Sequence, residues 1–248
     1  MGEIGARLGA GKVAEAFEYG AHLLKLYRDP GARSTAFAEA AILAIVGDHG
    51  LPVPEAFGAG QYLGRWGLVM SRAPGRPLAE LARADPKMVP AALDAMAALH
   101  LAMHAAVERR LQPLKHRLAD RLGTAPGLDD AVRHRLLGRL ATLPDGHRLC
   151  HGDFHPYNII GPPGAAVIID WPDATSGPPA ADACRSYLLL LHGAPPLADP
   201  YLVRYVAISG LARADILAWL PILAAARLCE NVPEEEARLL QLARSVLA

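Results

Sequence analysis

Polar side chains that can do chemistry crowd into one short segment, residues 150–160, with the sequence CHGDFHPYNII. Asp153 supplies a carboxylate, and Asn158 supplies an amide oxygen five residues later. A second carboxylate, Asp170, follows twelve residues after Asn158. Phosphoryl transfer uses one carboxylate to orient an attacking hydroxyl and accept its proton, and it uses further oxygen ligands to hold magnesium against the phosphates. The set therefore matches the requirements of phosphoryl transfer to a hydroxyl group.

Two short apolar strands are expected to position these residues, at 158–160 and 167–169, joined by the turn sequence GPPG. A strand pair of this kind can place Asp153, Asn158 and Asp170 around one point, which their sequence separation alone would not do.

Two other interpretations of the segment stay open. In the first, the Asp and Asn side chains only satisfy backbone groups of a turn. In the second, His151, Asp153 and His155 are the ligands of a metal-dependent hydrolase. The second interpretation leaves Asn158 and Asp170 without a role.

A lysine lies inside an apolar strand pattern upstream, in the sequence HLLKLY at 22–27. Lys25 must either extend to the surface of the sheet or point into a cleft. Glu39 is the one acidic residue in the helix expected over about 34–46, so it is the natural partner of that lysine. Taken alone, Lys25 would be a surface lysine.

The sequence HGDFHPYN, followed by IDW at 169–171, resembles the signature of the aminoglycoside phosphotransferase and choline kinase family, which is related to protein kinases. The resemblance implies an α+β, bilobal, protein-kinase-like fold, with a small N-terminal antiparallel sheet lobe that has one helix and a larger, mainly helical C-terminal lobe. It implies that Asp153 is the catalytic base, that His151 orients its loop, and that Asn158 and Asp170 bind Mg²⁺.

The same resemblance implies an ATP site in the N-terminal lobe. Lys25 would hold the α- and β-phosphates and pair with Glu39. Gly9 and Gly11 form a glycine pair whose amides can approach phosphate, although the third glycine of the usual motif is missing. Lys12, next to them, contacts phosphate or faces solvent.

The sequence LVMSRAPG at 68–75 resembles the hinge of the family. Backbone groups from Ser71 to Ala73 would bind the adenine edge, and Met70 would lie behind it. An ordinary strand that runs into a turn is the alternative.

Asp182 is expected to be structural, either bracing the catalytic loop or capping the next helix. His100 and His104 have the i, i+4 spacing of helical metal ligands, but no third ligand is evident. They are interpreted as partly buried helix residues.

The order of the expected elements supports two lobes, 1–72 for nucleotide binding and 73–248 for catalysis and substrate binding. Short strands are expected at 13–19, 22–27 and 66–70, with a hairpin connection at 58–64. Helical patterns dominate beyond the boundary, and one of the expected helices covers 129–143. Three helix starts carry capping signals, at Ser34 or Thr35, at Asp85-Pro86 and at 231–234.

Composition excludes several classes of function. Lys plus Arg equals Asp plus Glu at 25 each, so the basic excess of a nucleic-acid binder is missing. The N-terminus has no signal-peptide pattern, and no apolar stretch was expected to span a membrane. The three cysteines have no metal-type spacing and are expected to be buried thiols of a cytoplasmic protein.

The resulting hypothesis is an ATP- and Mg²⁺-dependent kinase that phosphorylates a hydroxyl group of a small molecule. The resemblance includes aminoglycosides and amino alcohols among the acceptors, although residues 194–248 carry six acidic and five basic side chains and so form no strongly anionic surface. A catalytically inactive nucleotide-binding regulator with the same fold is the alternative. The sequence does not specify the oligomeric state.

Overall fold

The computed structural model describes residues 2–247 and divides into two compact units. The first unit contains residues up to 86 together with 157–172, and the second contains 87–156 together with the residues from 173 onward. The short segment that follows the predicted catalytic loop is therefore grouped with the N-terminal part of the chain. The lobe boundary at residue 72 stays a prediction.

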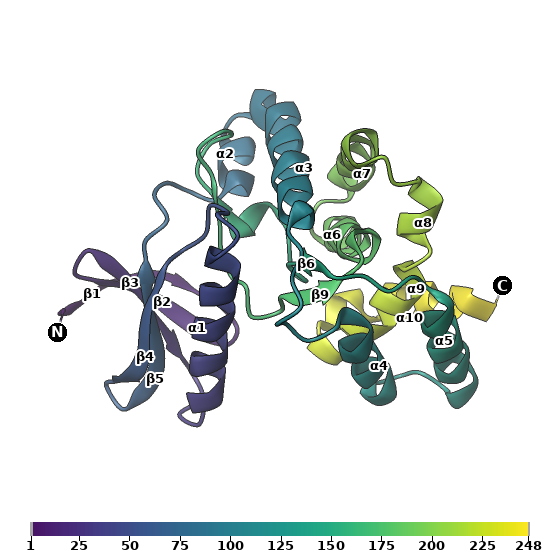
Figure 1. The fold of residues 1–248 in the computed structure, drawn as a ribbon, viewed down its shortest axis with the longest axis horizontal. Coiled ribbons are helices and arrows are strands. Elements are labelled where there is room, and N and C mark those ends of the chain that lie inside the picture. Colours follow the sequence, from purple (N-terminus) through teal and green to yellow (C-terminus); the bar gives the residue numbers. More distant parts are fainter. Residues whose placement is uncertain (1, 248) are drawn as a thin grey trace. The chain divides into compact units, whose positions relative to one another are not determined.

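An antiparallel five-stranded sheet is the main feature of the first unit (Figure 1). Its strands are ordered β1-β2-β3-β5-β4, with bounds β1 (Ile4–Ala10), β2 (Ala14–Tyr19), β3 (His22–Tyr27), β4 (Ala56–Tyr62) and β5 (Arg65–Ser71). Leu24 and Leu26 alternate onto one face of β3 and form a small core with Val69. Helix α1 (Arg33–Gly47) packs on β4 and β5. The expected antiparallel sheet with one helix is confirmed.

Two details of this sheet differ from the sequence expectations. Residues 4–10 form a strand, although only a glycine loop was expected there. The expected connection at 58–64 is mostly strand β4, and the turn lies at Leu63 and Gly64, both with positive φ. Pairing with β5 supplies the backbone hydrogen bonds that keep this glycine-rich strand extended, so tertiary context overrides local propensity.

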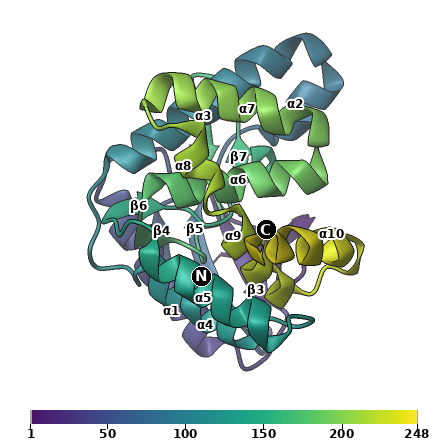
Figure 2. The same cartoon turned by 90° about the vertical axis from the view of Figure 1, so that its right-hand side faces the viewer.

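The second unit is mainly helical, as expected (Figure 2). Its helices are α3 (Val89–Ala105), α4 (Leu114–Thr124), α5 (Asp130–Thr142), α6 (Pro179–Gly193), α7 (Pro195–Ser209), α8 (Arg213–Leu217), α9 (Leu220–Arg227) and α10 (Pro233–Arg244). Helix α6 packs against α7, α8 and α9, so its residues 181–190 are buried. A two-stranded sheet of β6 (Arg148–Cys150) and β9 (Thr175–Gly177) lies at the start of the catalytic loop.

Two of the three expected side-chain caps are wrong. Helices α1 and α10 begin after Ala32 and Val232, and neither of these residues makes a side-chain cap hydrogen bond. At the third site a 3-10 helix, Pro86–Met88, begins directly after Asp85 and continues into α3. Tertiary packing of the buried helix faces replaces the cap at these ends. The helix expected from Asp129 is confirmed, because the Asp129 carboxylate accepts a hydrogen bond from the Val132 amide at 2.9 Å.

One helical stretch, Pro86–Ala105, is long and apolar enough to cross a membrane by length and composition. Its buried residues include His100 and His104, whose rings are hydrogen-bonded to side chains of other helices. A core helix accounts for both the hydropathy and these contacts. Of the three cysteines, Cys150 and Cys184 are buried thiols as expected, whereas Cys229 is partly exposed.

Candidate active site

A lysine and two carboxylates form an ion-pair cluster in the first unit. The Nζ atom of Lys25 lies 2.8 Å from Glu39 Oε1 and 2.7 Å from Asp170 Oδ1. Glu39 belongs to the buried face of α1, together with Ala36 and Leu43, and its side chain is 2% exposed. A buried glutamate needs a partner, and Lys25 provides it. The predicted Lys25–Glu39 pair is confirmed.

The two carboxylates of this cluster keep Lys25 protonated. Burial alone would lower the pKa of its ammonium group, but the negative charges of Glu39 and Asp170 outweigh that effect and raise the pKa above its ordinary value. Tyr27 lies two residues along the same strand, and its hydroxyl donates to Glu39. Burial and that neighbouring carboxylate raise the pKa of Tyr27, so it stays a neutral donor.

The two predicted magnesium ligands lie at one end of a hairpin in the first unit. This hairpin consists of β7 (Ile159–Ile160) and β8 (Val167–Ile168), close to the expected bounds. The amide of Ile169 donates to the carbonyl of Asn158 at 2.9 Å, so the backbones at Asn158 and Asp170 run side by side. Carboxylate and amide oxygens are ligands that Mg²⁺ prefers. The residue types and their placement therefore fit a magnesium site.

Asp170 has an unusual backbone conformation. Its φ is 64°, in the left-handed region that residues other than glycine rarely adopt. Its side chain is 42% exposed and receives the hydrogen bond from Lys25. Such conformations cost about 1–3 kcal/mol and are concentrated at functional sites. The neighbouring Trp171 is fully buried, and its indole donates to the Ile168 carbonyl at 3.0 Å, which fixes the chain on one side.

Gly9 and Gly11 lie at the connection between β1 and β2. Gly9 belongs to β1, and the amide of Gly11 donates to the Ala14 carbonyl at 2.8 Å. Neither has a positive φ, and an added Cβ at Gly9 would meet no protein atom within 4 Å among the described residues. The fold itself therefore does not require glycine at position 9, and the backbone there is open to a close approach from outside.

The predicted hinge residues lie at the end of β5. Met70 is buried, and Ala73 follows the strand directly. The amide of Ser71 donates to the Glu55 carbonyl at 2.8 Å, and the Ser71 hydroxyl accepts from the Glu55 amide at 2.9 Å. The Ser71 amide is thus already engaged, so any contact with adenine would have to use its carbonyl or the groups of residues 72–73.

His151 and Asp153 belong to the second unit, in the loop that follows β6. Asp182, in the first turn of α6, accepts hydrogen bonds from the His151 amide at 2.7 Å and the Gly152 amide at 2.8 Å. Gly152 has φ of 82°, and an added Cβ would lie 2.5 Å from the Asp173 carbonyl oxygen, so only glycine fits. The expectation that Asp182 braces the loop is confirmed.

Asp182 is itself held by two histidines. The Nε2 atoms of His100 and His104 lie 3.0 and 3.1 Å from Asp182 Oδ2, and their Nδ1 atoms lie 2.6 Å from the hydroxyls of Tyr201 and Tyr205. Neutral histidines that donate to the carboxylate and accept from the tyrosines satisfy every ring nitrogen. The three groups have the spacing of a metal site, but protein partners already use all of these nitrogens. His100 and His104 are thus more buried than expected.

Burial sets the protonation of this network. It lowers the pKa of His100 to about 4, with a further contribution from His104. For Asp182, burial would raise the pKa, but the hydrogen bonds from His100 and His104 hold it well below the ordinary value. The Asp182 carboxylate anion therefore fixes the predicted catalytic loop through the amides of His151 and Gly152.

Acid should destabilise the protein through His100 before the carboxylates titrate. The folded state keeps this histidine neutral, whereas the unfolded chain takes up a proton below pH 6.5, so the free energy of unfolding falls as the pH drops from 6.5 to about 4. The pKa difference corresponds to a loss of about 3 kcal/mol. Urea denaturation of the native protein and of His100→Gln between pH 6.5 and about 4 measures this loss of unfolding free energy. Equal pH slopes for the two proteins would contradict the assignment.

The Asp153 carboxylate lies beside an arginine and a histidine. Arg185 Nη2 lies 3.5 Å from Asp153 Oδ1, and His155 Nε2 lies 3.4 Å from Oδ2. Burial would raise the pKa of Asp153, but His155 and the Arg185 charge hold it well below its usual range. The Asp153 amide also donates to the His151 ring at 3.2 Å, which agrees with a role for His151 in orienting the loop.

Arg185 was not predicted from the sequence. It is 6% exposed, its Nε donates to the Gly152 carbonyl at 3.0 Å, and its Nη2 donates to Glu230 at 2.7 Å. The available signal was its place on α6, one helical turn after Asp182, which puts both residues on the same side of the helix.

Comparison with known proteins now decides the family. The model of the phosphotransferase enzyme family matches residues 16–217, well over half of the chain. The chain belongs to the phosphotransferase enzyme family. The matched range contains Lys25, Glu39, Asp153, Asn158 and Asp170. A search of curated protein sequences gave no significant match.

Solved structures similar to this phosphotransferase-family protein share its fold at low sequence identity. A thermostable mutant of aminoglycoside phosphotransferase APH(4)-Ia, in a ternary complex with AMP-PNP and hygromycin B, matches with a TM-score of 0.73 and 17% identity over 98% of this chain and 92% of the other. An aminoglycoside-3'-phosphotransferase of type VIII gives 0.63 and 22%, over 92% and 93% of the two chains. APH(3'')-Id from Streptomyces rimosus, in complex with ADP and streptomycin, gives 0.62 and 19%, over 86% and 90%.

Proposed function

We propose that this phosphotransferase-family protein transfers the γ-phosphoryl group of ATP to a hydroxyl of a small molecule. The observation that carries the proposal is the cluster of Lys25, Glu39 and Asp170, in which a buried glutamate fixes a lysine beside an exposed carboxylate. Kinases use these residue types on a strand, a helix and a metal-binding loop to hold MgATP. Two of the similar structures contain AMP-PNP or ADP.

In this proposal the residues of the first unit bind the nucleotide. Lys25 holds the α- and β-phosphates, Gly9 and Gly11 allow the β1–β2 backbone to approach them, and residues 70–73 receive the adenine. Asn158 and Asp170 hold magnesium, which when bound neutralises negative charge on the phosphates. The exposed Asp170 carboxylate and the open backbone at Gly9 support these roles.

Asp153 is proposed to orient the acceptor hydroxyl and to accept its proton. Its depressed pKa keeps it an anion at neutral pH, so the carboxylate can accept a hydrogen bond from the acceptor hydroxyl. Asn158 follows five positions later, so at most about 17 Å of extended chain connects the two residues. Most of the rate enhancement would come from positioning and electrostatics rather than from covalent chemistry.

The acceptor is tested by measuring ADP release from MgATP across a panel of aminoglycosides, amino alcohols and sugars. The panel includes aminoglycosides because the similar structures carry hygromycin B or streptomycin. Acceptor-dependent release establishes the kinase. MgATP binding without release from any acceptor, including acidic alcohols, would favour the inactive nucleotide-binding regulator. The incomplete glycine motif is the feature that favours the regulator.

Replacing Lys25 with methionine is expected to weaken MgATP binding by at least about tenfold, because the phosphates lose a charged partner. The same change leaves Glu39 buried without its cation, so we also expect a loss of about 3 kcal/mol in unfolding free energy. Titration calorimetry and urea denaturation measure the two effects. The matched control is Lys87→Met at an exposed lysine of the second unit. Unchanged nucleotide affinity in Lys25→Met would rule out the phosphate role.

A further inference from the structure

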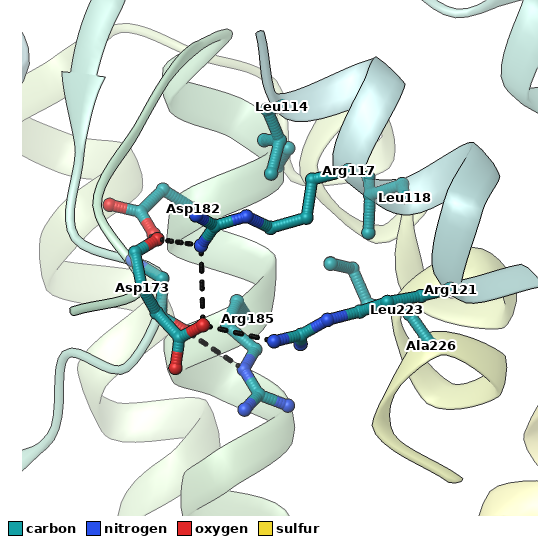
Figure 3. A pocket seen from close by; sticks show the side chains of 11 residues that line it. Leu114, Arg117, Leu118, Arg121, Asp173, Asp182, Arg185, Leu223 and Ala226 are labelled. Atoms are coloured by element: carbon teal, nitrogen blue, oxygen red, sulfur yellow. Dashed lines mark hydrogen bonds and ion pairs between the residues drawn. The ribbon is translucent and has the colours of Figure 1, made fainter. Parts of the chain in front are cut away.

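A pocket lined by arginine lies in the second unit, directly beside the catalytic loop (Figure 3). Arg117 and Arg121 enter it from α4, Arg185 enters from α6, and Gly152 and Asp173 complete the near wall. The cavity volume is about 30 Å³, which is room for two or three water-sized groups. It therefore suits one small polar group of a ligand rather than a whole sugar ring.

The carboxylates around this pocket are shared among the arginines. Asp173 lies between two guanidinium groups and accepts from Arg117 at 3.2 Å and Arg121 at 2.9 Å (Figure 3). Glu230 accepts from Arg185 at 2.7 Å and also lies 3.4 Å from Arg121. Each carboxylate thus faces more than one cation.

Glu230 also pairs with Arg227 at 2.6 Å, so this one carboxylate is shared among three arginines, of which Arg227 has a second partner in Glu235. Asp182, the other acidic residue of the lining, is committed to two backbone amides and two histidines. Its negative charge therefore neutralises little of the positive charge of the arginines.

The guanidinium groups keep donors that the protein does not use. Among the described residues, no hydrogen bond is made by Arg117 Nη2, Arg121 Nε or Arg185 Nη1. Burial, together with the nearby Arg121 charge, lowers the pKa of Arg117 in spite of Asp173. An added anion would relieve this repulsion, and the planar guanidinium fork matches the geometry of a carboxylate or phosphate.

We propose that this pocket binds an oxyanion of the acceptor, so that the substrate is a small alcohol that also carries a carboxylate or phosphate group. The inference rests on the proposed kinase function. Arg185 connects the two sites, because it lines the pocket and lies 3.5 Å from Asp153. An acceptor whose anionic group is held by Arg117 and Arg121 has its hydroxyl beside that base. A polycation would instead meet three guanidinium groups.

The reaction is the ordinary transfer to that hydroxyl. The hydroxyl oxygen forms a bond to the γ-phosphorus while the bond from that phosphorus to the β,γ-bridging oxygen breaks. ADP leaves with the bridging oxygen and its electron pair, and the hydroxyl proton passes to Asp153 and then to water. The arginines take no part in bond making. They bind the anionic group of the acceptor and so fix the position of its hydroxyl.

The test uses the full chain with MgATP and four probe acceptors: glycerate, glycerol 3-phosphate, choline and kanamycin. We expect ADP release with one or both anionic probes, which also separates a carboxylate from a phosphate acceptor. Arg121→Gln should raise KM for the anionic acceptor by about tenfold or more, with kcat changed less than about threefold, because the residue binds without reacting. Arg121→Lys keeps the positive charge but loses the planar guanidinium group, so its KM should lie between the values of the native protein and Arg121→Gln. Arg204→Gln, at an ion pair with Asp94 outside the pocket, should match the native protein.

A binding measurement separates failure of this inference from failure of the kinase function. At about ten times its Kd, an anionic probe should raise the Tm of the native protein by about 3 °C, and this rise should vanish in Arg121→Gln. Binding that depends on Arg121, without ADP release, supports the oxyanion pocket and contradicts the kinase proposal. Turnover of kanamycin or choline that is insensitive to Arg121→Gln, or a native protein that no anionic probe stabilises, overturns the oxyanion pocket.

Discussion

Replacing Asp153 with asparagine is expected to lower kcat for the acceptor by at least about 100-fold, with a much smaller effect on the affinity for MgATP. General-base catalysis by one positioned side chain contributes about 10²–10⁴-fold, and an amide cannot accept the hydroxyl proton. The substitution keeps the size of the side chain, and Arg185 retains its partner Glu230, so the fold should persist. Steady-state kinetics together with nucleotide titration measure the separation of the two effects.

The matched control is Asp145→Asn, which changes a largely exposed aspartate of the same unit. It should leave kcat within about twofold of the native value. The loss of activity supports a catalytic role for Asp153 only if Asp153→Asn and the native protein unfold at the same temperature. A folded Asp153→Asn protein with near-native kcat would remove Asp153 from the mechanism.

Replacing Asp182 with alanine should destabilise the protein by about 3–5 kcal/mol and abolish most activity. The change leaves the amides of His151 and Gly152 and the rings of His100 and His104 without their shared acceptor, and all of these except the Gly152 amide are buried. Loss of one partner from a buried charged network has a cost of this size, because the remaining groups stay desolvated. Urea denaturation at pH 7 provides the measurement.

Tyr205→Phe is a graded control for this network. It removes one hydroxyl from His104 and leaves the carboxylate in place, so the expected loss is about 1 kcal/mol with activity largely retained. If Asp182→Ala unfolded at the same urea concentration as Tyr205→Phe, the four hydrogen bonds to Asp182 would not be what holds the catalytic loop.

The sequence alone determined the chemistry-bearing segment and the elements next to it. The spacing of Asp153, Asn158 and Asp170, the strand around Lys25 and the helix around Glu39 are local patterns, since each depends on residues within one element or one connection. The Asp129 cap is another local signal, because its donor lies three residues away. The Lys25–Glu39 pair was predictable because a strand leads almost directly into the helix and only one acidic residue was available there.

Only the tertiary structure decided which distant side chains meet. Strand β1 and most of β4 lack strong strand patterns and are extended because neighbouring strands pair with them. The network around Asp182 joins α3, α6 and α7, and its hydrogen bonds at His100 and His104 link residues 78 to 101 positions apart. The arginine pocket likewise combines α4 with α6.

Local sequence patterns indicate the period and the approximate position of an element, but they carry no information about which helix faces pack together. Burial then gives the long-range contacts their effect. It lowers the pKa of His100 and collects Arg117, Arg121 and Arg185 beside the predicted catalytic loop. The hydrogen bonds from His100 and His104 keep Asp182 an anion in spite of its burial. For that reason the reaction class could be predicted from the sequence, whereas the charge of the acceptor could be proposed only from the packed structure.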